Sequence, residues 1–534
     1  MKYTVDSISK HVGLHIIGQV VYLSEKQVTR QQLGQLSRRL PQQSWYQELE
    51  GKFVSLDHLP PSYHKGFMML EELCRIRSDE KINIINRDDP FSELRPEREP
   101  EWVSKLSPDA RGYLQISFAR TDGMDPLAIL PKVPFMGFGY IIPDEGMARD
   151  AVDTFSLYRL AGVRQLSFLS DPVLKSVIPR SAGLMFDHNR YCHSIDVYVV
   201  ANLGAHNLKV KEEDLNTLLT AAISHDALTP AGGDSVKLID PKAFDEDAHY
   251  HELLHGEAWE NYRERYGINP ELLVKTVNGE GLLGRILDFA DKSAYLARDV
   301  KAYLRTESPQ EPTYVNTGYR AMGEIVEKDP HVFALWESVY RRGEHLVFGD
   351  KERLGRFLTL RALMFRELYH NPFSRFFEYL VGKGIVKWLY NQGRLTREKL
   401  LRERDQWLEQ VVGEALGIPY FFTQFYDFDS FRTEECPDLK HARARMAEFE
   451  SNQETLVILD DFAPVVKSAV DRFSVQRKGE IVSFSKAFPR IARDVEDILN
   501  FPKKTKLFFF NLDELRVPIR SRALLKKIMA DAGN

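Results

Sequence analysis

The sequence has few cysteines, and they form no recognisable pattern. The 534 residues contain three, at Cys74, Cys192 and Cys436, which are far apart and odd in number. This spacing supports neither a disulfide framework nor a zinc ribbon. We therefore expect a protein of a reducing compartment.

Long hydrophobic runs are also missing from the sequence. No apolar stretch approaches the roughly 20 residues that a helix needs to cross a bilayer. The first segment, MKYTVDSISKHVGLHIIG, lacks the uninterrupted apolar core of a signal peptide. These two features predict a cytoplasmic protein without a membrane partner.

Positive charge is not in excess. Lys and Arg number 72, Asp and Glu number 77, and the net charge is −5. This balance does not indicate a nucleic-acid partner. No Walker loop, dinucleotide-binding fingerprint or nucleophile elbow is found either, so three common kinds of catalytic or nucleotide site have no motif here.

What the sequence does contain predicts a mainly α fold. With 43% hydrophobic residues, the chain can bury a large core over two to four domains. We expect a mixed accessory region over residues 1–135, with a strand in GYLQISFA, and an all-helical domain over residues 136–400. Residues 401–534 are expected to form a small α+β appendage with strands in TLVILDDF and TKLFFFNLDEL. The helices expected in the central part include HVFALWESVYRR, at residues 331–342.

Three candidate groups of metal ligands lie on otherwise apolar helical faces. They are His193, the adjacent pair His225 and Asp226, and Asp291. A single histidine on such a face is usually an ordinary core residue, but three faces agree here. A buried carboxylate requires a partner or a metal, and imidazoles with carboxylates suit Mn, Fe or Zn. The gaps of 32 and 65 residues place the ligands on separate elements, so a shared metal site is predicted.

The order of these residues, H then HD then D, resembles the signature of the HD-domain phosphohydrolases. Their surroundings resemble one branch of that superfamily, the dNTP triphosphohydrolases, in four places. The matching segments are HNRYCHS, DFADKSAYLARD, YRLAGVRQLSFL and RALMFRELYHN. They span roughly residues 140 to 375, so the resemblance implies an HD-domain helical core there.

The resemblance also implies a reaction and its residues. A divalent metal (Mn, Fe, Zn or Mg) held by His193, His225, Asp226 and Asp291 would promote attack of water on the α-phosphorus of a dNTP. The products would be a deoxynucleoside and tripolyphosphate, and a homo-oligomer is expected. The resemblance also assigns substrate-binding roles. Arg190 matches the family's phosphate-binding arginine, and Arg361 matches its triphosphate-binding arginine. Gln165 and Asp299 match groups near the 3′-hydroxyl, Tyr295 matches the tyrosine on the deoxyribose, and Tyr369 matches a sugar-side tyrosine.

The sequence departs from the family after the HD pair. Two histidines used for phosphate binding and proton transfer are replaced by Thr229 and Asp234. Asp234 could transfer the proton instead, and His251 is the rival. The departure keeps other functions open: a nucleotidase or cyclic-nucleotide phosphodiesterase, a di-iron oxygenase, or a catalytically inactive HD module that senses nucleotides or serves as a scaffold.

Overall fold

The computed structural model describes most of the chain from residue 147 onward. The described residues are 118–119, 127–128, 147–166, 189–304, 316–329, 332–333, 335–343, 345–418, 421, 431–449, 452, 454–460, 470–500, 505–513 and 518–531. Most of the accessory region expected over residues 1–135 lies outside them. Its predicted strand at residues 112–119 overlaps the short strand β1 (Phe118–Ala119), which pairs with β2 (Leu127–Ala128).

The described elements are mostly helices, which confirms the predicted fold class. The chain forms two compact units whose segments alternate along the sequence. Unit 1 comprises Met1–Leu157, Cys192–Ser224 and Leu253–Ala302; unit 2 comprises Tyr158–Tyr191, His225–Glu252 and Tyr303–Asn534. The domain boundaries expected near residues 135 and 400 remain predictions.

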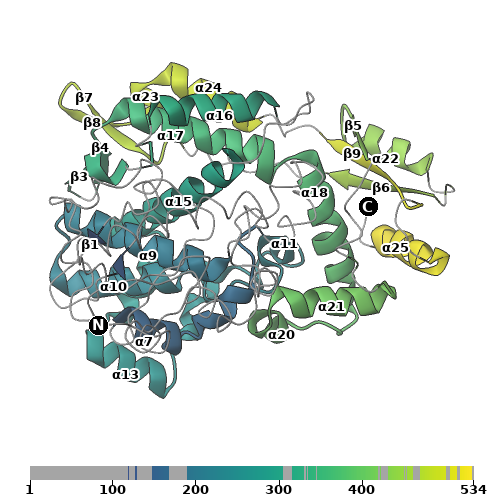
Figure 1. The fold of residues 1–534 in the computed structure, drawn as a ribbon, viewed down its shortest axis with the longest axis horizontal. Coiled ribbons are helices and arrows are strands. Elements are labelled where there is room, and N and C mark those ends of the chain that lie inside the picture. The colour runs from purple at the N-terminus through teal and green to yellow at the C-terminus, as the bar shows by residue number, and fades with distance from the viewer. Residues whose placement is uncertain are drawn as a thin grey trace, which may run out of the picture. The chain divides into compact units, whose positions relative to one another are not determined.

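Unit 1 is built from helices, several of which are labelled in Figure 1. Its long helices are α7 (Met147–Thr154), α9 (Arg190–Asn207), α10 (Glu212–Ser224), α13 (Glu257–Tyr266), α14 (Pro270–Val277) and α15 (Gly281–Leu304). Local signals set the ends: Gly267, with a φ of 64°, terminates α13, and Asn269 caps α14 with Pro270 in the first turn.

The core of unit 1 follows the apolar spacing of the sequence. In α10, the predicted inward positions are all buried: Leu215, Leu218, Leu219, Ala222 and Ile223. This helix packs against α7 and α14. Residues 208–280 separate α9 from α15 in the sequence, yet a methyl group added at Gly204 of α9 would lie 3.7 Å from Ile286 of α15. The two helices that carry His193 and Asp291 therefore touch directly.

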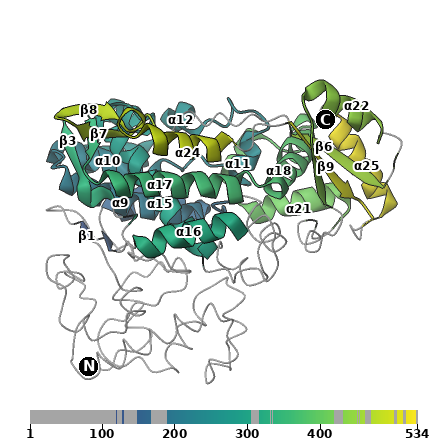
Figure 2. The ribbon, with the colours of Figure 1, turned by 90° about the horizontal axis from the view of Figure 1, so that it is seen from above.

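The first part of unit 2 combines helices with a four-stranded sheet. The sheet order is β3 (Val339–Arg342), β4 (His345–Phe348), β7 (Ser474–Arg477) and β8 (Glu480–Ser483), and β4 runs parallel to β7. The helices of this part include α16 (Asn316–Lys328), α17 (Lys351–Met364), α23 (Phe484–Ala487) and α24 (Pro489–Asn500). Helices α17 and α24 lie side by side in Figures 1 and 2 and are in contact.

The helix expected over residues 331–342 is wrong. Only a single short turn, Leu335–Ser338, is helical, and the chain then enters β3. Gly343, with a φ of 62°, turns the backbone so that residues 339–342 pair with 345–348. Val339 is buried, whereas Tyr340, Arg341 and Arg342 are exposed, so the strand follows from its pairing with β4 rather than from an apolar period.

The central part of unit 2 consists of consecutive helical segments. They are the π-helical turn η7 (Phe365–Tyr369), α18 (Pro372–Glu378), the π-helical segment η8 (Tyr379–Val386), α19 (Lys387–Asn391), α20 (Arg397–Arg402) and α21 (Asp405–Leu416). Segment η8 packs against α11 (Gly233–Lys237), and a Cβ at Gly382 would overlap the Ser235 carbonyl oxygen. This close approach matters because α11 follows the HD pair. The HD pair and α11 are joined to α12 (Glu246–His249) and the 3-10 turn η5 (Tyr250–Leu253).

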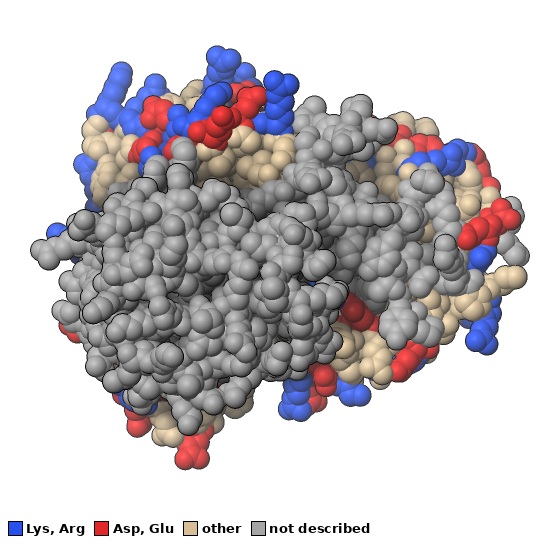
Figure 3. All heavy atoms as spheres, in the orientation of Figure 1, with Lys and Arg blue, Asp and Glu red and all other residues tan. Residues whose placement is uncertain are grey.

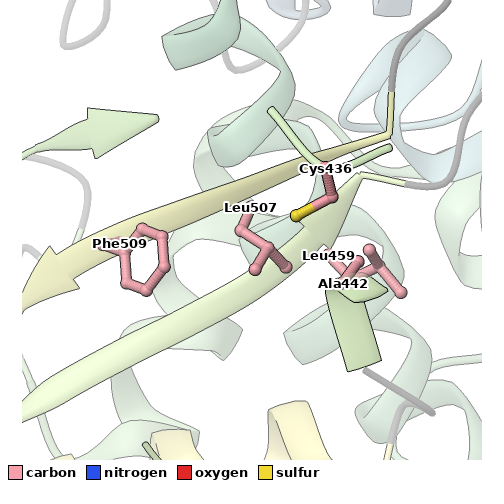
Figure 4. Close-up of a cluster of buried hydrophobic side chains, with 5 residues drawn as sticks. All are labelled: Cys436, Ala442, Leu459, Leu507 and Phe509. Carbon is pink, nitrogen blue, oxygen red and sulfur yellow. The ribbon is translucent and has the colours of Figure 1, made fainter. Parts of the chain in front are cut away.

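The expected C-terminal strands are confirmed as β6 (Thr455–Asp460) and β9 (Lys506–Asn511). With β5 (Arg432–Glu435) they form an antiparallel sheet in which β9 is central. Helix α22 (Leu439–Ala447) packs on this sheet, and α25 (Ile519–Asp531) ends the described chain. Figure 4 shows the apolar cluster between β9, β6 and α22, which includes the thiol of Cys436. Burial raises the pKa of that thiol.

The described surface has mixed charge. On the face shown in Figure 3, Lys and Arg side chains are interspersed with Asp and Glu. Among the helices that the structure describes, none is both long and apolar enough to cross a membrane.

Candidate metal centre

His193 and Asp291 form a close pair inside unit 1. His193 lies in the first turn of α9, and its Nε2 is 2.9 Å from Oδ1 of Asp291 in α15. The histidine side chain is 2% exposed and the aspartate side chain is 33% exposed. The predicted face of His193 is confirmed, since Val197 and Val200 on the same helix are buried. The partly exposed carboxylate of Asp291 leaves this pair open to an ion that arrives from solvent.

His225 directly follows the last residue of α10. One ligand atom from each of His193, His225 and Asp291 lies within 4.8 Å of the other two. Two imidazoles and a carboxylate are a donor set that suits a divalent transition metal.

The sequence predicted that His225 and Asp226 continue the apolar face of a helix. In the structure they do not. Helix α10 ends at Ser224, whose hydroxyl donates to the Thr220 carbonyl oxygen over 2.6 Å. His225 and Asp226 then lie in a turn closed by the bond from Thr229 N to Asp226 O, 2.9 Å long. The apolar period could not reveal this stop, because helix ends depend on hydrogen bonds rather than on hydrophobic spacing.

Asp226 is not a member of the close group found among the described residues. Its Oδ2 accepts a hydrogen bond from Nη1 of Arg190 over 3.0 Å, and its Oδ1 is 3.6 Å from Nε2 of His225. Its place as a fourth metal ligand therefore remains a prediction. Arg190 and Asp226 are both almost fully buried, so each neutralises the other.

A chain of charged groups continues from Arg190. Its Nη2 donates to Asp234 over 2.6 Å, Lys237 lies 2.9 Å from the same carboxylate, and Lys237 also lies 3.2 Å from Glu246. Sequence reasoning missed Lys237 and Glu246, because neither stands in a matching motif. The i, i+3 spacing of Asp234 and Lys237 was the available signal.

The electrostatics of this chain favour ionised Asp234. Asp234 is exposed, and its cationic partners Lys237 and Arg190 hold the pKa of its carboxyl well below its usual range. Burial and the neighbouring carboxylates Asp226 and Asp234 raise the pKa of Glu246 against the opposing effect of the cations. Asp234 is therefore a weak base and a poor proton donor near neutral pH.

The loop that carries the HD pair is fixed by long-range hydrogen bonds within unit 2. Arg159, in the 3-10 turn η2 (Leu157–Gly162), donates to the carbonyl oxygens of Ala227 and Thr229 over 3.0 and 2.7 Å. Burial lowers the pKa of Arg159 to about 10, which leaves it charged at neutral pH. Asp405 accepts a 2.7 Å bond from Gly232 N, and Ala231 N donates to Leu400 O over 2.8 Å.

Two predicted substrate residues lie on the helix of Asp291. Asp291, Tyr295 and Asp299 follow one another at four-residue intervals in α15, as the sequence predicted. Tyr295 is partly exposed, whereas Asp299 is 1% exposed. Gln165 is also buried, and its Oε1 has no hydrogen-bond partner among the residues described. A buried amide oxygen in this state can accept a hydrogen bond from a water or a ligand.

Arg361 and Tyr369 both contact the aromatic ring of Phe365. The Arg361 guanidinium is 4.8 Å from the centre of the Phe365 ring, and Tyr369 meets the same ring edge-on at 5.1 Å. Tyr369 closes the π-helical turn η7, which shifts its direction relative to a regular helix. Their roles in binding a triphosphate and a sugar remain predictions.

His251 lies in the 3-10 turn η5, and its side chain is exposed. Its Nδ1 lies 3.1 Å from the Ala248 carbonyl oxygen, and its ring stacks beside His249 at 6.4 Å. Neighbouring His249 bonds to Glu252 over 2.7 Å, and Arg397 holds the other oxygen of Glu252 at 2.9 Å. The proton-transfer role of His251 also remains a prediction.

Comparisons with known proteins show a shared fold and no family. No protein-family model matches the sequence, and a search of curated proteins found no match. A crystal structure of a hypothetical protein from Aquifex aeolicus is similar: the match has 15% identity, covers 76% of this chain and 100% of that chain, and has a TM-score of 0.50. A phosphohydrolase from Bacteroides thetaiotaomicron matches with 14% identity, 72% and 99% coverage and a TM-score of 0.48. At that TM-score the second structure bears on neither the fold nor the function of this chain.

Proposed function

We propose that this protein is a metal-dependent phosphohydrolase that converts deoxynucleoside triphosphates to deoxynucleosides and tripolyphosphate. The observation that carries the proposal is the cluster of His193, His225 and Asp291, whose ligand atoms lie within 4.8 Å of one another. This donor set suits a divalent ion, and the sequence around it resembles the dNTP triphosphohydrolase branch. When bound, the ion would polarise the phosphoryl oxygen and lower the pKa of an attacking water.

Arg190 would bind the phosphate next to this cluster. It begins the helix that carries His193, three residues away, so the two side chains leave the same turn of α9. Its guanidinium is buried against Asp226 and Asp234, which fixes its orientation before substrate arrives. A planar guanidinium matches phosphate oxygens in pairs and would offset the negative charge that grows in the transition state.

The reaction cleaves the bond between the α-phosphorus and O5′ of the nucleoside. Water would add its oxygen to phosphorus, and one proton would pass to the leaving O5′. Asp234 is better suited to orient Arg190 than to transfer this proton, because its cationic partners keep its carboxylate ionised. Gln165, with a buried amide oxygen, and Asp299 would bind the 3′-hydroxyl, with Tyr295 against the sugar.

The experiment is product analysis with the full chain. Purified protein is incubated with Mn²⁺ and each dNTP, and nucleoside, monophosphate, diphosphate and tripolyphosphate are separated. Nucleoside with tripolyphosphate supports the proposal, and Asp291→Asn should abolish both products and Mn²⁺ binding. The control Asp288→Asn changes a carboxylate of the same helix that pairs with Lys292. Monophosphate or orthophosphate as the product would indicate a nucleotidase or phosphodiesterase instead.

A nucleotide sensor is the second candidate function. It is favoured by one observation, the ion-paired state of Asp234 at a position where the family resemblance would place a histidine. Tight dNTP binding with no product in the presence of Mn²⁺, Fe²⁺ or Mg²⁺ would support the sensor. Light scattering with and without dNTP tests the homo-oligomer that we also propose.

A further inference from the structure

A second buried pair joins the two helices that carry His193 and Asp291. Arg298 of α15 donates from Nε to Oδ2 of Asp196 over 2.6 Å and from Nη2 to Oδ1 over 2.9 Å. The side chains are only 11% and 4% exposed. Both carboxylate oxygens are engaged, so the guanidinium holds the aspartate of α9 at two points.

The two pairs share the same helix faces. Asp196 is three residues after His193, and Arg298 is seven residues after Asp291, which correspond to one and two helical turns. The contact of Gly204 with Ile286 is a third point where α9 and α15 approach each other. The His193–Asp291 pair therefore lies within one helix interface and depends on its register.

We propose that Asp196 and Arg298 are positioning residues that set the register of α9 on α15, so that His193 and Asp291 meet one metal ion. The inference rests on the metal centre of the proposed function. A slip of one residue along a helix moves a side chain by about 1.5 Å and turns it by about 100°. Metal ligands tolerate only a few tenths of an ångström, and a two-point ion pair resists both sliding and rotation.

Stability alone does not account for such a pair. A buried ion pair contributes little more than apolar side chains of similar size, because its attraction is offset by the loss of hydration. Burial in fact raises the pKa of Asp196, and Arg298 opposes that rise. Replacing the pair by apolar side chains should therefore preserve folding, while it removes the directional constraint between the helices.

The test measures Mn²⁺ affinity by calorimetric titration of metal-stripped, full-length protein. Asp196→Asn and Arg298→Lys each keep the approximate shape and lose the two-point pair. We expect both to bind Mn²⁺ about 10–100-fold more weakly than the wild type, as is typical when groups that orient metal ligands are changed. Glu271→Gln, which breaks the exposed pair with Lys275 elsewhere in unit 1, should leave the affinity unchanged.

A double variant separates positioning from stability. Asp196→Leu combined with Arg298→Met fills the interface with apolar groups, and we expect a near-normal unfolding temperature in EDTA together with weakened Mn²⁺ binding. Wild-type affinity in this double variant, or in both single variants, would overturn the inference. A wild-type protein that binds no Mn²⁺, Fe²⁺ or Zn²⁺ at all would instead remove the proposed metal centre and the inference with it.

Discussion

The carboxylate of Asp234 lies between two cations, Arg190 at 2.6 Å and Lys237 at 2.9 Å. These partners keep it ionised, so it cannot act as the group whose titration limits activity near neutral pH. We predict that Asp234→Asn raises KM for dNTP while kcat falls by less than about tenfold, short of the roughly 10²–10⁴-fold loss of a proton carrier. Profiles of kcat against pH should have the same acidic limb in both proteins. Disappearance of that limb in the variant would return Asp234 to the proton-transfer role.

Tyr295 is the residue on which sugar selectivity should depend. It is partly exposed on α15, one turn from both Asp291 and the buried Asp299. Under the proposed function, a phenol ring against the 2′-carbon would leave no room for a ribose hydroxyl, so dGTP should be preferred over GTP. We predict that Tyr295→Ala narrows the ratio of the two kcat/KM values by about tenfold or more, in the range of lost pocket contacts. An unchanged ratio, with Tyr266→Ala as the comparison, would remove Tyr295 from the sugar site.

Protonation of the Glu378 carboxylate should make the stability of the fold depend on pH. Burial raises its pKa to about 7, against the pull of Arg375 at 2.6 Å and with a further rise from Asp234. Between pH 4.5 and 7 the folded protein therefore holds a proton that the unfolded chain has released. The free energy of unfolding should fall as pH rises through this range, by at most about 3 kcal/mol. Urea unfolding of Glu378→Gln in EDTA should lack this part of the slope; identical slopes in both proteins would contradict the assignment.

The residues found from sequence and those missed differ in the range of their interactions. His193, Asp291 and Tyr295 lie on helices, so a 3.6-residue period and a motif sufficed to place them. Arg159 acts through partners that the period does not reveal, since it binds carbonyl oxygens 68 and 70 residues away. Local patterns carry no information about such pairings.

Among the elements, the loop from His225 to Gly232 depends most on distant support. Arg159 donates to two of its carbonyl oxygens, those of the buried residues Ala227 and Thr229. We predict that Arg159→Met lowers the free energy of unfolding by about 2–4 kcal/mol, since two buried acceptors lose their donor. Hydrogen exchange at the amides of Thr229, Ala231 and Gly232 should accelerate.

The matched control for this loop is Arg402→Met. Arg402 makes only an exposed pair with Glu398, with side chains 76% and 69% exposed, so its loss should cost less than about 1 kcal/mol. Equal exchange rates in the wild type and Arg159→Met would show that Asp405 and Leu400 hold the loop without the arginine.

The sequence predicts whether a segment is a helix or a strand where one hydrophobic period dominates that segment. Helix α10 and strands β6 and β9 follow from long apolar patterns, and each lies where the sequence indicated. Residues 339–342 mix aromatic, valine and arginine side chains, so a helical pattern could be fitted to them. Their strand exists because residues 345–348 and 474–475 pair beside them, which is a tertiary effect.

At the scale of the whole molecule, both units are assembled from separated segments. All of unit 1 precedes residue 303, but residues 225–252 in its midst belong to unit 2. A fragment of residues 1–304 therefore lacks Leu400, Asp405 and Arg397, the partners of that segment. We predict that limited trypsin digestion cuts the fragment at Lys237 or Lys242 at least tenfold faster than the full chain. Equal cleavage rates would show that residues 225–252 are protected without those partners.

The same separation matters while the protein is being made. Asp405 is 179 residues after Asp226 in the chain, and ribosomes add roughly 5–20 residues per second. For about ten to forty seconds of synthesis, the HD pair is present without the carboxylate that fixes Gly232. A transition metal that met the nascent chain in this interval would find the imidazole of His225 on an unbraced loop. Loading of the proposed metal centre would therefore follow translation of the C-terminal part, and metal supply during expression should affect the yield of active protein less than metal supply after it.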